Sequence, residues 1–163
     1  MVFVASERGC PESLDVGTTV FRVAEEDGSA NVETLWATPL GGDEYQLDNS
    51  PFYAYSVSWQ DVVHAPYDVT EAFPTFQRVL RKSGNRTVRV ILEEPANPGN
   101  KGDQVLKGLV ALGCDYEGAN RIYMSVNIPA SVELERVCSY LVEKGVQWEH
   151  ADPTYDELHK TDA

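Results

Sequence analysis

The sequence predicts an α+β protein in which a small N-terminal β-barrel-like or bent antiparallel sheet precedes a ferredoxin-like βαββαβ unit. Between residues 18 and 82, β-branched and aromatic residues are interrupted by turn signals about every eight to twelve residues. Between residues 83 and 152, two amphipathic helical patterns alternate with strand patterns. The chain of 163 residues is long enough for a substantial core. We expect residues 1–17 to form a loose arm and residues 153–163 a charged tail.

The N-terminal half shows strand patterns separated by turn residues. Glycine and acidic residues predict turns at 25–29 and 41–43, and Pro39 ends the second strand pattern. Closure into a small barrel and a strongly bent open sheet both agree with these short strands. Strands are expected at 19–23, 32–37, 45–47, 52–57, 62–64 and 76–80.

The C-terminal half has the order strand, helix, hairpin, helix, strand. A strand at 87–92 precedes a helix that Asp103 is expected to cap and Gly113 to end. In the hairpin of 114–117 and 122–128, alternation sends Met124, Val126 and Ile128 to one face and Tyr123, Ser125 and Asn127 to the other. Ser131 is expected to cap a second helix, which Gly145 ends before a last strand at 146–149.

The charge excludes several classes of protein. The chain has 26 acidic and 13 basic side chains, so its formal charge is 13 − 26 = −13, which disfavours binding to nucleic acid. No apolar run approaches the roughly 20 residues of a membrane span.

The N-terminal residues lack the pattern of a secretory signal, and three cysteines form no paired framework, so we expect a cytoplasmic protein with reduced thiols. The three histidines lack the spacing of a metal site, and we expect no metal or cofactor.

Acidic and aromatic residues alternate in the N-terminal half. Tyrosine and tryptophan are favoured interface anchors, and a negative surface attracts a basic partner. The alternative is that the acids form a solvated surface and many of the aromatics belong to the core. The residues proposed to bind a partner are Glu25, Glu26, Asp27, Glu33, Asp43, Glu44, Tyr45, Tyr53 and Tyr55.

A basic segment follows, with five cations between residues 78 and 89. The turn at 83–87 would present backbone amides and a guanidinium to an anion, and the alternative is that the cations neutralise the protein's own acids. The residues proposed to bind an anion are Arg81, Lys82, Arg86 and Arg89.

Two catalytic arrangements are weaker candidates. Asp61 would act as a base beside Asn49, although such residues near Pro51 more often build turns and caps. Cys114 would act as a nucleophile with His64 or His150 as its base. It follows the end of a predicted helix, where the dipole raises a thiol pKa, so we expect no catalytic residues.

Six short segments in order are similar to a known family. The chain resembles the bacterial domain-of-unknown-function family 4265 from about Phe21 to Glu149. The resemblance implies a bacterial, cytoplasmic setting and supplies no activity. The family pattern has a glycine where this chain has Gln60, which argues against a tight turn there. The segments are Leu35–Ala37, Tyr45–Phe52, Asp61–Ala65, Ser83–Val90, Leu112–Cys114 and Val126–Pro129.

These observations favour a non-catalytic acidic binding protein. Small acidic bacterial proteins without a catalytic constellation resemble immunity or antitoxin proteins, which neutralise a basic toxin, such as a nuclease, by docking onto it. One alternative is a ligand-sensing module that binds an anionic metabolite at the seam of a ferredoxin-like unit. The third is an enzyme of unknown type.

Overall fold

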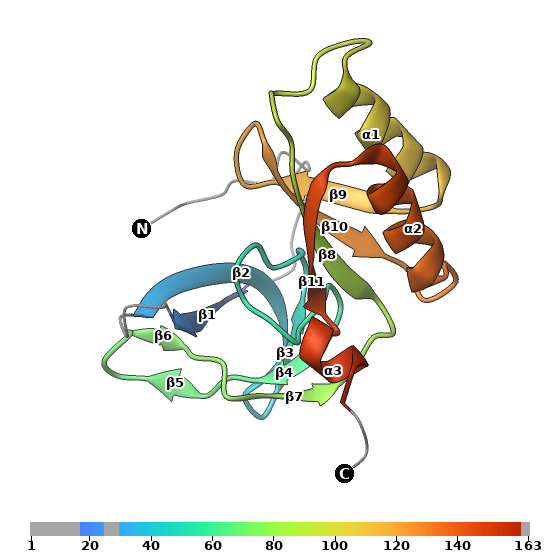
Figure 1. Ribbon diagram of the computed structural model, residues 1–163. Helices are drawn as coiled ribbons and strands as arrows, with labels where there is room; N and C mark the ends of the chain where they lie inside the picture. The colour runs from blue at the N-terminus through green and yellow to red at the C-terminus, as the bar shows by residue number, and fades with distance from the viewer. Residues whose placement is uncertain (1–16, 25–29, 161–163) are drawn as a thin grey trace.

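The N-terminal half folds around an open antiparallel sheet in the computed structural model, which describes residues 17–24 and 30–160 (Figure 1). The sheet has the order β1-β2-β3-β4-β7, and all neighbours are antiparallel. Its two edge strands do not pair, so the sheet is bent and open, and the barrel-like form is not closed. The strands are β1 (Gly17–Ala24), β2 (Ala30–Gly41), β3 (Glu44–Leu47), β4 (Val62–His64) and β7 (Arg78–Arg81).

Local turn chemistry explains the β2–β3 hairpin. Gly42 and Asp43 have φ values of 62° and 60°, and two successive left-handed residues give the turn whose twist matches an antiparallel pair. The expected turn at 41–43 is thus confirmed. The expected turn at 25–29 and residues 1–16 of the expected arm at 1–17 lie outside the described residues, and Gly17 begins β1.

One face of this sheet builds the first core. Leu35, Ala37, Leu47 and Val63 are fully or almost fully buried there, together with Phe21. The alternate residues of the same strands point to the opposite face, which we call the outer face.

The expected strand at 52–57 was wrong, and the expected strand at 76–80 begins two residues later than predicted. Residues 52–57 form an irregular loop, because the backbone amides of Phe52, Tyr53 and Ala54 donate to the carboxylate of Glu33 instead of to a neighbouring strand. The last strand covers Arg78–Arg81, and a separate two-stranded ribbon precedes it, formed by β5 (Tyr67–Asp68) and β6 (Phe73–Pro74). The strands β5, β6 and β7 have only two to four residues each, which is too few to show in the sequence the alternation of buried and exposed residues that marks a strand.

Gln60 adopts a left-handed conformation with φ of 65°, so a tight turn forms at this position without glycine. The Gln60 amide donates to the Leu47 carbonyl at 2.9 Å, and the Asp61 amide donates to the Ser58 carbonyl. The expectation that glutamine disfavours this turn was wrong, because these bonds hold the backbone in place.

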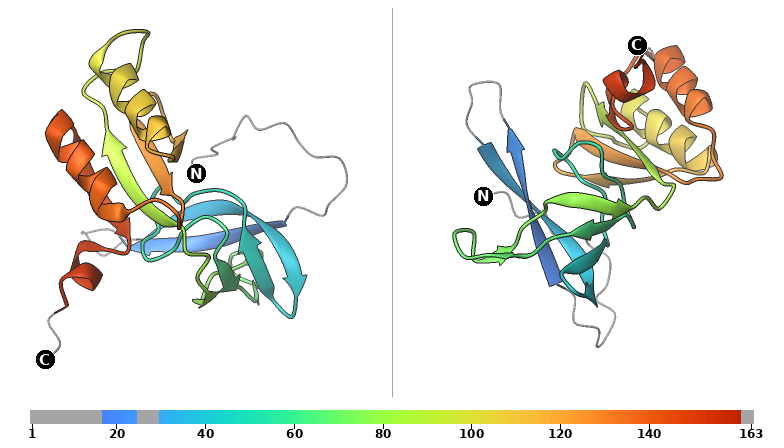
Figure 2. Two further views of the ribbon diagram at one scale, coloured as in Figure 1. Left: turned by 90° about the vertical axis from the view of Figure 1, so that its right-hand side faces the viewer. Right: turned by 90° about the horizontal axis from the view of Figure 1, so that it is seen from below.

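The C-terminal half has the expected chain order, strand–helix–strand–strand–helix–strand. Its sheet has the order β11-β8-β10-β9, with antiparallel neighbours, and α1 and α2 cover one face (Figures 1 and 2). Val88, Val90, Val126, Leu109 and Leu141 meet in the core between them. The elements are β8 (Arg86–Ile91), α1 (Lys101–Ala111), β9 (Asp115–Gly118), β10 (Tyr123–Ile128), α2 (Leu134–Lys144) and β11 (Gln147–Asp152).

The helix starts differ from the expected ones. Asn100 caps α1 by accepting a hydrogen bond from the Asp103 amide, so Asp103 lies inside the first turn. Glu133 stands at the N-cap of α2 without a side-chain bond, and Ser131 lies before it. Gly145 ends α2 with φ of 61°, as expected.

Part of the expected tail is folded. Tyr155–Leu158 forms α3, and Thr154 and Glu157 make a reciprocal capping box at its start. The Ser56 hydroxyl donates to Glu157 at 2.9 Å, so α3 contacts the irregular loop of the N-terminal half. None of the helices in the described part of the chain has the length and apolar character needed to cross a membrane.

Candidate functional site

The two halves meet along a polar sheet face. Because successive residues of a strand point to opposite sides, β8 sends Val88 and Val90 to the helices and Thr87 and Arg89 to the opposite face. The strand register sets Arg89 in a cross-strand row with Ser125 on one side and Glu149 on the other. Residues 51–58 lie over this face, and Ser125 donates to the Pro51 carbonyl at 2.7 Å.

Two buried ions hold this loop. Glu33 is 7% exposed, and its carboxylate accepts from the amides of Phe52 at 2.5 Å, Tyr53 at 3.0 Å and Ala54 at 2.8 Å. Arg89 is 1% exposed; it donates to the Ala54 carbonyl and pairs with Glu149 at 3.3 Å. Burial raises the pKa of Glu33, against the opposing effect of the three amide bonds and of Arg89. The amide and the carbonyl of Ala54 are thus each bound by a buried ion.

This loop presents two tyrosines to solvent, Tyr53 at 40% and Tyr55 at 49% exposure. The Tyr53 ring stacks on Tyr123 with centroids 5.7 Å apart, and the Tyr123 hydroxyl donates to the Phe52 carbonyl at 2.8 Å. The Tyr55 ring lies 4.5 Å from the Arg89 guanidinium, and its hydroxyl is 3.2 Å from both Glu149 oxygens. Burial raises the pKa of Tyr123 to about 12, so it stays a neutral donor.

Residues at the end of the four-stranded sheet that the loop at 51–58 does not cover form an exposed surface together with the two tyrosines. The register aligns Tyr123, Ile91 and Gln147 in the next cross-strand row, where Gln147 is exposed and the other two are partly buried. We call this surface the tyrosine patch. It consists of Tyr53, Tyr55, Ile91, Tyr123, Gln147 and Glu149.

A second polar cluster joins the halves beside the patch. Lys82 donates to Asp61 at 2.9 Å and to Asp152 at 2.6 Å, and both carboxylates are almost completely buried. Ser58 donates to Asp152 at 2.6 Å and lies 2.8 Å from the Thr87 hydroxyl. All these groups are satisfied within the chain, which makes the cluster a structural link.

The acidic residues proposed from sequence do not form one face. Glu33 is inside the protein, so its assignment to a partner-binding surface was wrong. Asp43 and Glu44 lie at the β2–β3 hairpin, and Tyr45 is half-buried against the first core. Glu25, Glu26 and Asp27 lie outside the described residues. Tyr53 and Tyr55 are the members of the proposed set that the tyrosine patch contains.

The four proposed anion-binding cations do not converge. Arg81 lies 3.6 Å from Glu44, Lys82 is bound as described above, and Arg89 is buried. Arg86 donates to the carbonyls of Pro129 and Val132. Within the described chain these contacts use the cations internally, which agrees with the alternative of self-neutralisation.

The candidate catalytic residues are also placed in structural roles. Asp61 is fully buried and accepts from the amides of Ser58 and Ser83, while Asn49 accepts from the Trp36 amide at 2.8 Å. Burial, with a contribution from the charge of Asp115, raises the pKa of the Cys114 thiol to about 11.

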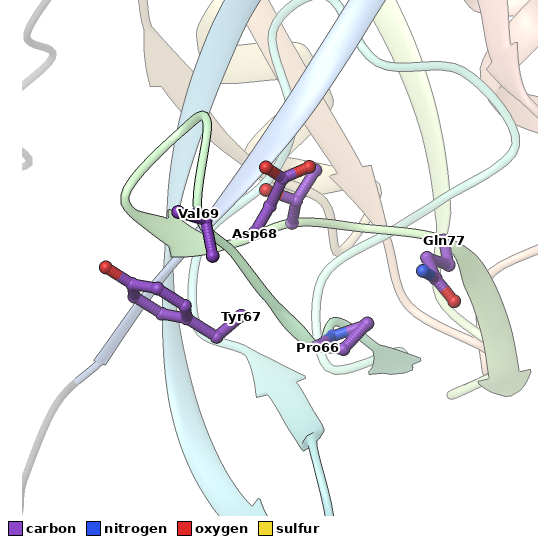
Figure 3. A pocket seen from close by; sticks show the side chains of 6 residues that line it. Pro66, Tyr67, Asp68, Val69 and Gln77 are labelled. Atoms are coloured by element: carbon purple, nitrogen blue, oxygen red, sulfur yellow. The ribbon is translucent and has the colours of Figure 1, made fainter.

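An open hollow lies elsewhere, beside the β5–β6 ribbon (Figure 3). Its lining contains one carboxylate and no histidine or cysteine. The lining residues are Pro66, Tyr67, Asp68, Val69, Thr75 and Gln77.

Four members of the patch were not among the residues proposed from sequence: Ile91, Tyr123, Gln147 and Glu149. Alternation on the strand at 122–128 already set Tyr123 apart from the core residues, and this was the available signal. The other three are recognisable only when β8 and β11 are known to be neighbours.

Comparison with known proteins identifies a family and a fold. The model of the family described as a domain of unknown function (DUF4265) matches residues 33–150. A crystal structure of a hypothetical protein from Neisseria gonorrhoeae is similar, with a TM-score of 0.74 over 88% of this chain and 99% of that chain, at 13% identity. That identity supports a shared fold alone. The search of curated proteins found no match. The family match spans most of the chain, and this protein therefore belongs to the DUF4265 family.

Proposed function

We propose that this protein is a non-catalytic acidic binding protein of the immunity type, which neutralises a basic toxin by docking through the tyrosine patch. One observation carries the proposal. The buried ions Glu33 and Arg89 hold residues 52–54 and thereby present Tyr53 and Tyr55 on a fixed backbone. Burying charges is costly, and here the cost secures the position of an exposed loop.

A loop that is already ordered binds more tightly, because less conformational entropy is lost on association. Tyrosines supply a large contact area with few rotatable bonds and are common anchors of protein interfaces. Glu149 and Gln147 add polar groups at the rim of the patch.

The charge around the patch supports a basic partner. Strand register places Asp115, Glu117 and Glu149 on the polar sheet face, and the hydrogen bond from Ser56 places Glu157 beside the loop. A negative surface of this kind speeds encounter with a positively charged protein.

We further infer that the C-terminal unit is ferredoxin-like. The chain order βαββαβ and the sheet order β11-β8-β10-β9 support this assignment. In this protein the loop at 51–58 covers the sheet face opposite the helices. The unit differs in this respect from a ferredoxin-like unit whose sheet face is left exposed.

Co-purification from the native host tests the proposal. The tagged full chain should retain a basic protein in a 1:1 ratio at low salt and lose much of it at high salt, because salt screens the attraction. Recovery of no stoichiometric basic partner at either salt concentration would overturn the proposal.

Variants then locate the contact. Tyr55→Ala should weaken binding of the recovered partner about 10- to 30-fold, the effect of losing an interface anchor. Tyr67→Ala is the matched control, because Tyr67 is 63% exposed on β5, outside the patch. Equal affinities of the two variants would place the interface elsewhere.

Glu33→Gln tests the role of the buried ion as a positioning residue. The new amide nitrogen would face a backbone donor, so the loop should lose order. Partner binding should weaken although no residue of the patch has changed, and amide hydrogen exchange at residues 52–54 should become faster. Unchanged exchange together with unchanged affinity would contradict this role.

A further inference from the structure

The outer face of the five-stranded sheet carries a stripe along β2 in which three large apolar side chains alternate with Thr34 and Thr38. Val32, Trp36 and Leu40 are 47%, 44% and 47% exposed, whereas Leu35 and Ala37 between them are completely buried. Alternation of side chains explains the pattern, and the eight steps from Val32 to Leu40 span about 26 Å at the usual rise of a strand. An exposed tryptophan between two aliphatic residues is typical of a protein interface.

The charge of this face differs from that of the whole chain. Glu44 is on β3, Asp48 directly follows it, and Arg78 and Arg81 are on β7. The Asp48 amide donates to the Trp36 carbonyl at 2.8 Å, which continues the β2–β3 register and sets Asp48 beside the stripe. The formal charges of these four described side chains sum to 2 − 2 = 0, whereas the whole chain has a formal charge of −13.

We propose that two copies of this chain associate through the outer face of the sheet, with Trp36 at the centre of the contact. Two chains of charge −13 repel each other, and this repulsion is smallest where an apolar face has no net charge. Each copy also offers both signs of charge to the other. A basic partner would gain little attraction from a neutral face, which distinguishes this surface from the tyrosine patch.

The association leaves the tyrosine patch free. The loop at 51–58 packs on the inner side of the sheet, where Ala54 and Val57 belong to the first core. The proposal therefore stands independently of the proposed function.

Sedimentation equilibrium of the purified full chain at low and high salt tests the association. The chain should be dimeric at micromolar concentration, and its dissociation constant should fall as salt rises, because screening removes the repulsion between like charges. This dependence is opposite in sign to that expected for docking of a basic partner. A monomer at both salt concentrations would overturn the proposal, and so would a dimer that weakens with salt.

Variants of the stripe locate the contact. Trp36→Glu should weaken the dimer at least about 30-fold, as expected for loss of an interface anchor, and Trp36→Ser should do so without adding charge. Tyr67→Glu is the control, because it adds the same charge at another exposed aromatic residue and should leave the dimer intact. Circular dichroism verifies that each variant is folded, and Leu40→Glu replaces any stripe variant that is not. Folded stripe variants that remain as dimeric as the control would exclude this face.

Discussion

Gln60 shows at the scale of one residue how contacts distant in sequence decide a backbone conformation. Its φ of 65° lies in the region that glycine occupies without steric cost and that other residues enter at a cost. The hydrogen bond to Leu47 and the neighbouring turn bond from Asp61 to Ser58 hold it there. The sequence alone predicts no tight turn at a glutamine, because those partners are brought together only by the fold.

Replacing Gln60 with glycine should therefore stabilise the protein. We expect Gln60→Gly to raise the free energy of unfolding by about 0.5–1 kcal/mol, because the left-handed strain disappears. Urea denaturation measures this change. Gln46→Gly is the matched control, since Gln46 is exposed on strand β3 and should lose about the same amount through added flexibility of the unfolded chain. Destabilisation by both substitutions would contradict the prediction.

His150 makes stability depend on pH. Burial, and then the charge of His159, lowers the pKa of His150 below its ordinary value of 6.5. Between the lowered pKa and 6.5 the unfolded chain binds more protons than the folded one, so this contribution to stability is present above pH 6.5 and is lost as the pH falls below it.

His150→Phe should reduce that loss, because phenylalanine keeps the ring contact with Trp148 and takes no proton. The measurement is the melting temperature as a function of pH for the variant and the original protein. Trp148→Phe, which leaves the histidine in place, should retain the original dependence. Identical pH profiles of His150→Phe and the original protein would show that His150 is not responsible.

At the scale of elements, α1 and α2 approach closely because α1 has a glycine at the contact. A Cβ atom at Gly108 would lie 1.8 Å from the Tyr140 hydroxyl. That hydroxyl is 3.2 Å from the Gln104 carbonyl and 3.1 Å from the Val105 carbonyl. It can approach these carbonyls because Gly108 has no side chain in its way. A helix-disfavouring residue is thus retained for packing.

The effect of Gly108→Ala on stability should change sign when Tyr140 is replaced as well. Gly108→Ala alone should destabilise the protein by about 1–3 kcal/mol, because the ring must leave its site. In a Tyr140→Ala background the same change should stabilise it by up to about 1 kcal/mol through helix propensity. A double-mutant cycle in urea measures both values. The same sign in both backgrounds would show that Tyr140 is not the obstacle.

The loop at 52–57 shows why an element was assigned incorrectly from sequence. Its aromatic and small residues have the composition of a strand. A strand also needs a neighbour to accept its amide hydrogens, and here the carboxylate of Glu33 accepts them instead. Composition reports local preference, whereas the choice of acceptor depends on residues about twenty positions away.

At the scale of the whole molecule, the polar seam makes the two halves depend on each other. Arg89, Ser125 and Thr87 are buried only because the N-terminal loop covers them. An isolated C-terminal unit would expose this face and leave the loop without its anchor. The halves are therefore expected to unfold together.

The protein should show one cooperative unfolding transition. Far-ultraviolet circular dichroism and tryptophan fluorescence should give the same midpoint in urea. Lys82→Met should lower the free energy of unfolding by about 2–4 kcal/mol without splitting the transition, because it leaves Asp61 and Asp152 buried without their cation. Glu93→Gln, at an exposed ion pair with Lys101, should change it by less than about 1 kcal/mol. Two separate midpoints would show that the halves are independent.

The sequence by itself determined the α+β class, the chain order of the C-terminal half, the β2–β3 turn and the family, because these follow from periodicity, turn residues and short segments that are local in the chain. Tertiary structure decided which charges are surface charges. Glu33 and Arg89 were candidates for binding and became internal supports, while Glu149 and Tyr123 joined Tyr53 and Tyr55 on a surface. The physical reason is that a buried charge needs a specific partner, and that partner is supplied by chain segments that meet only when the molecule folds.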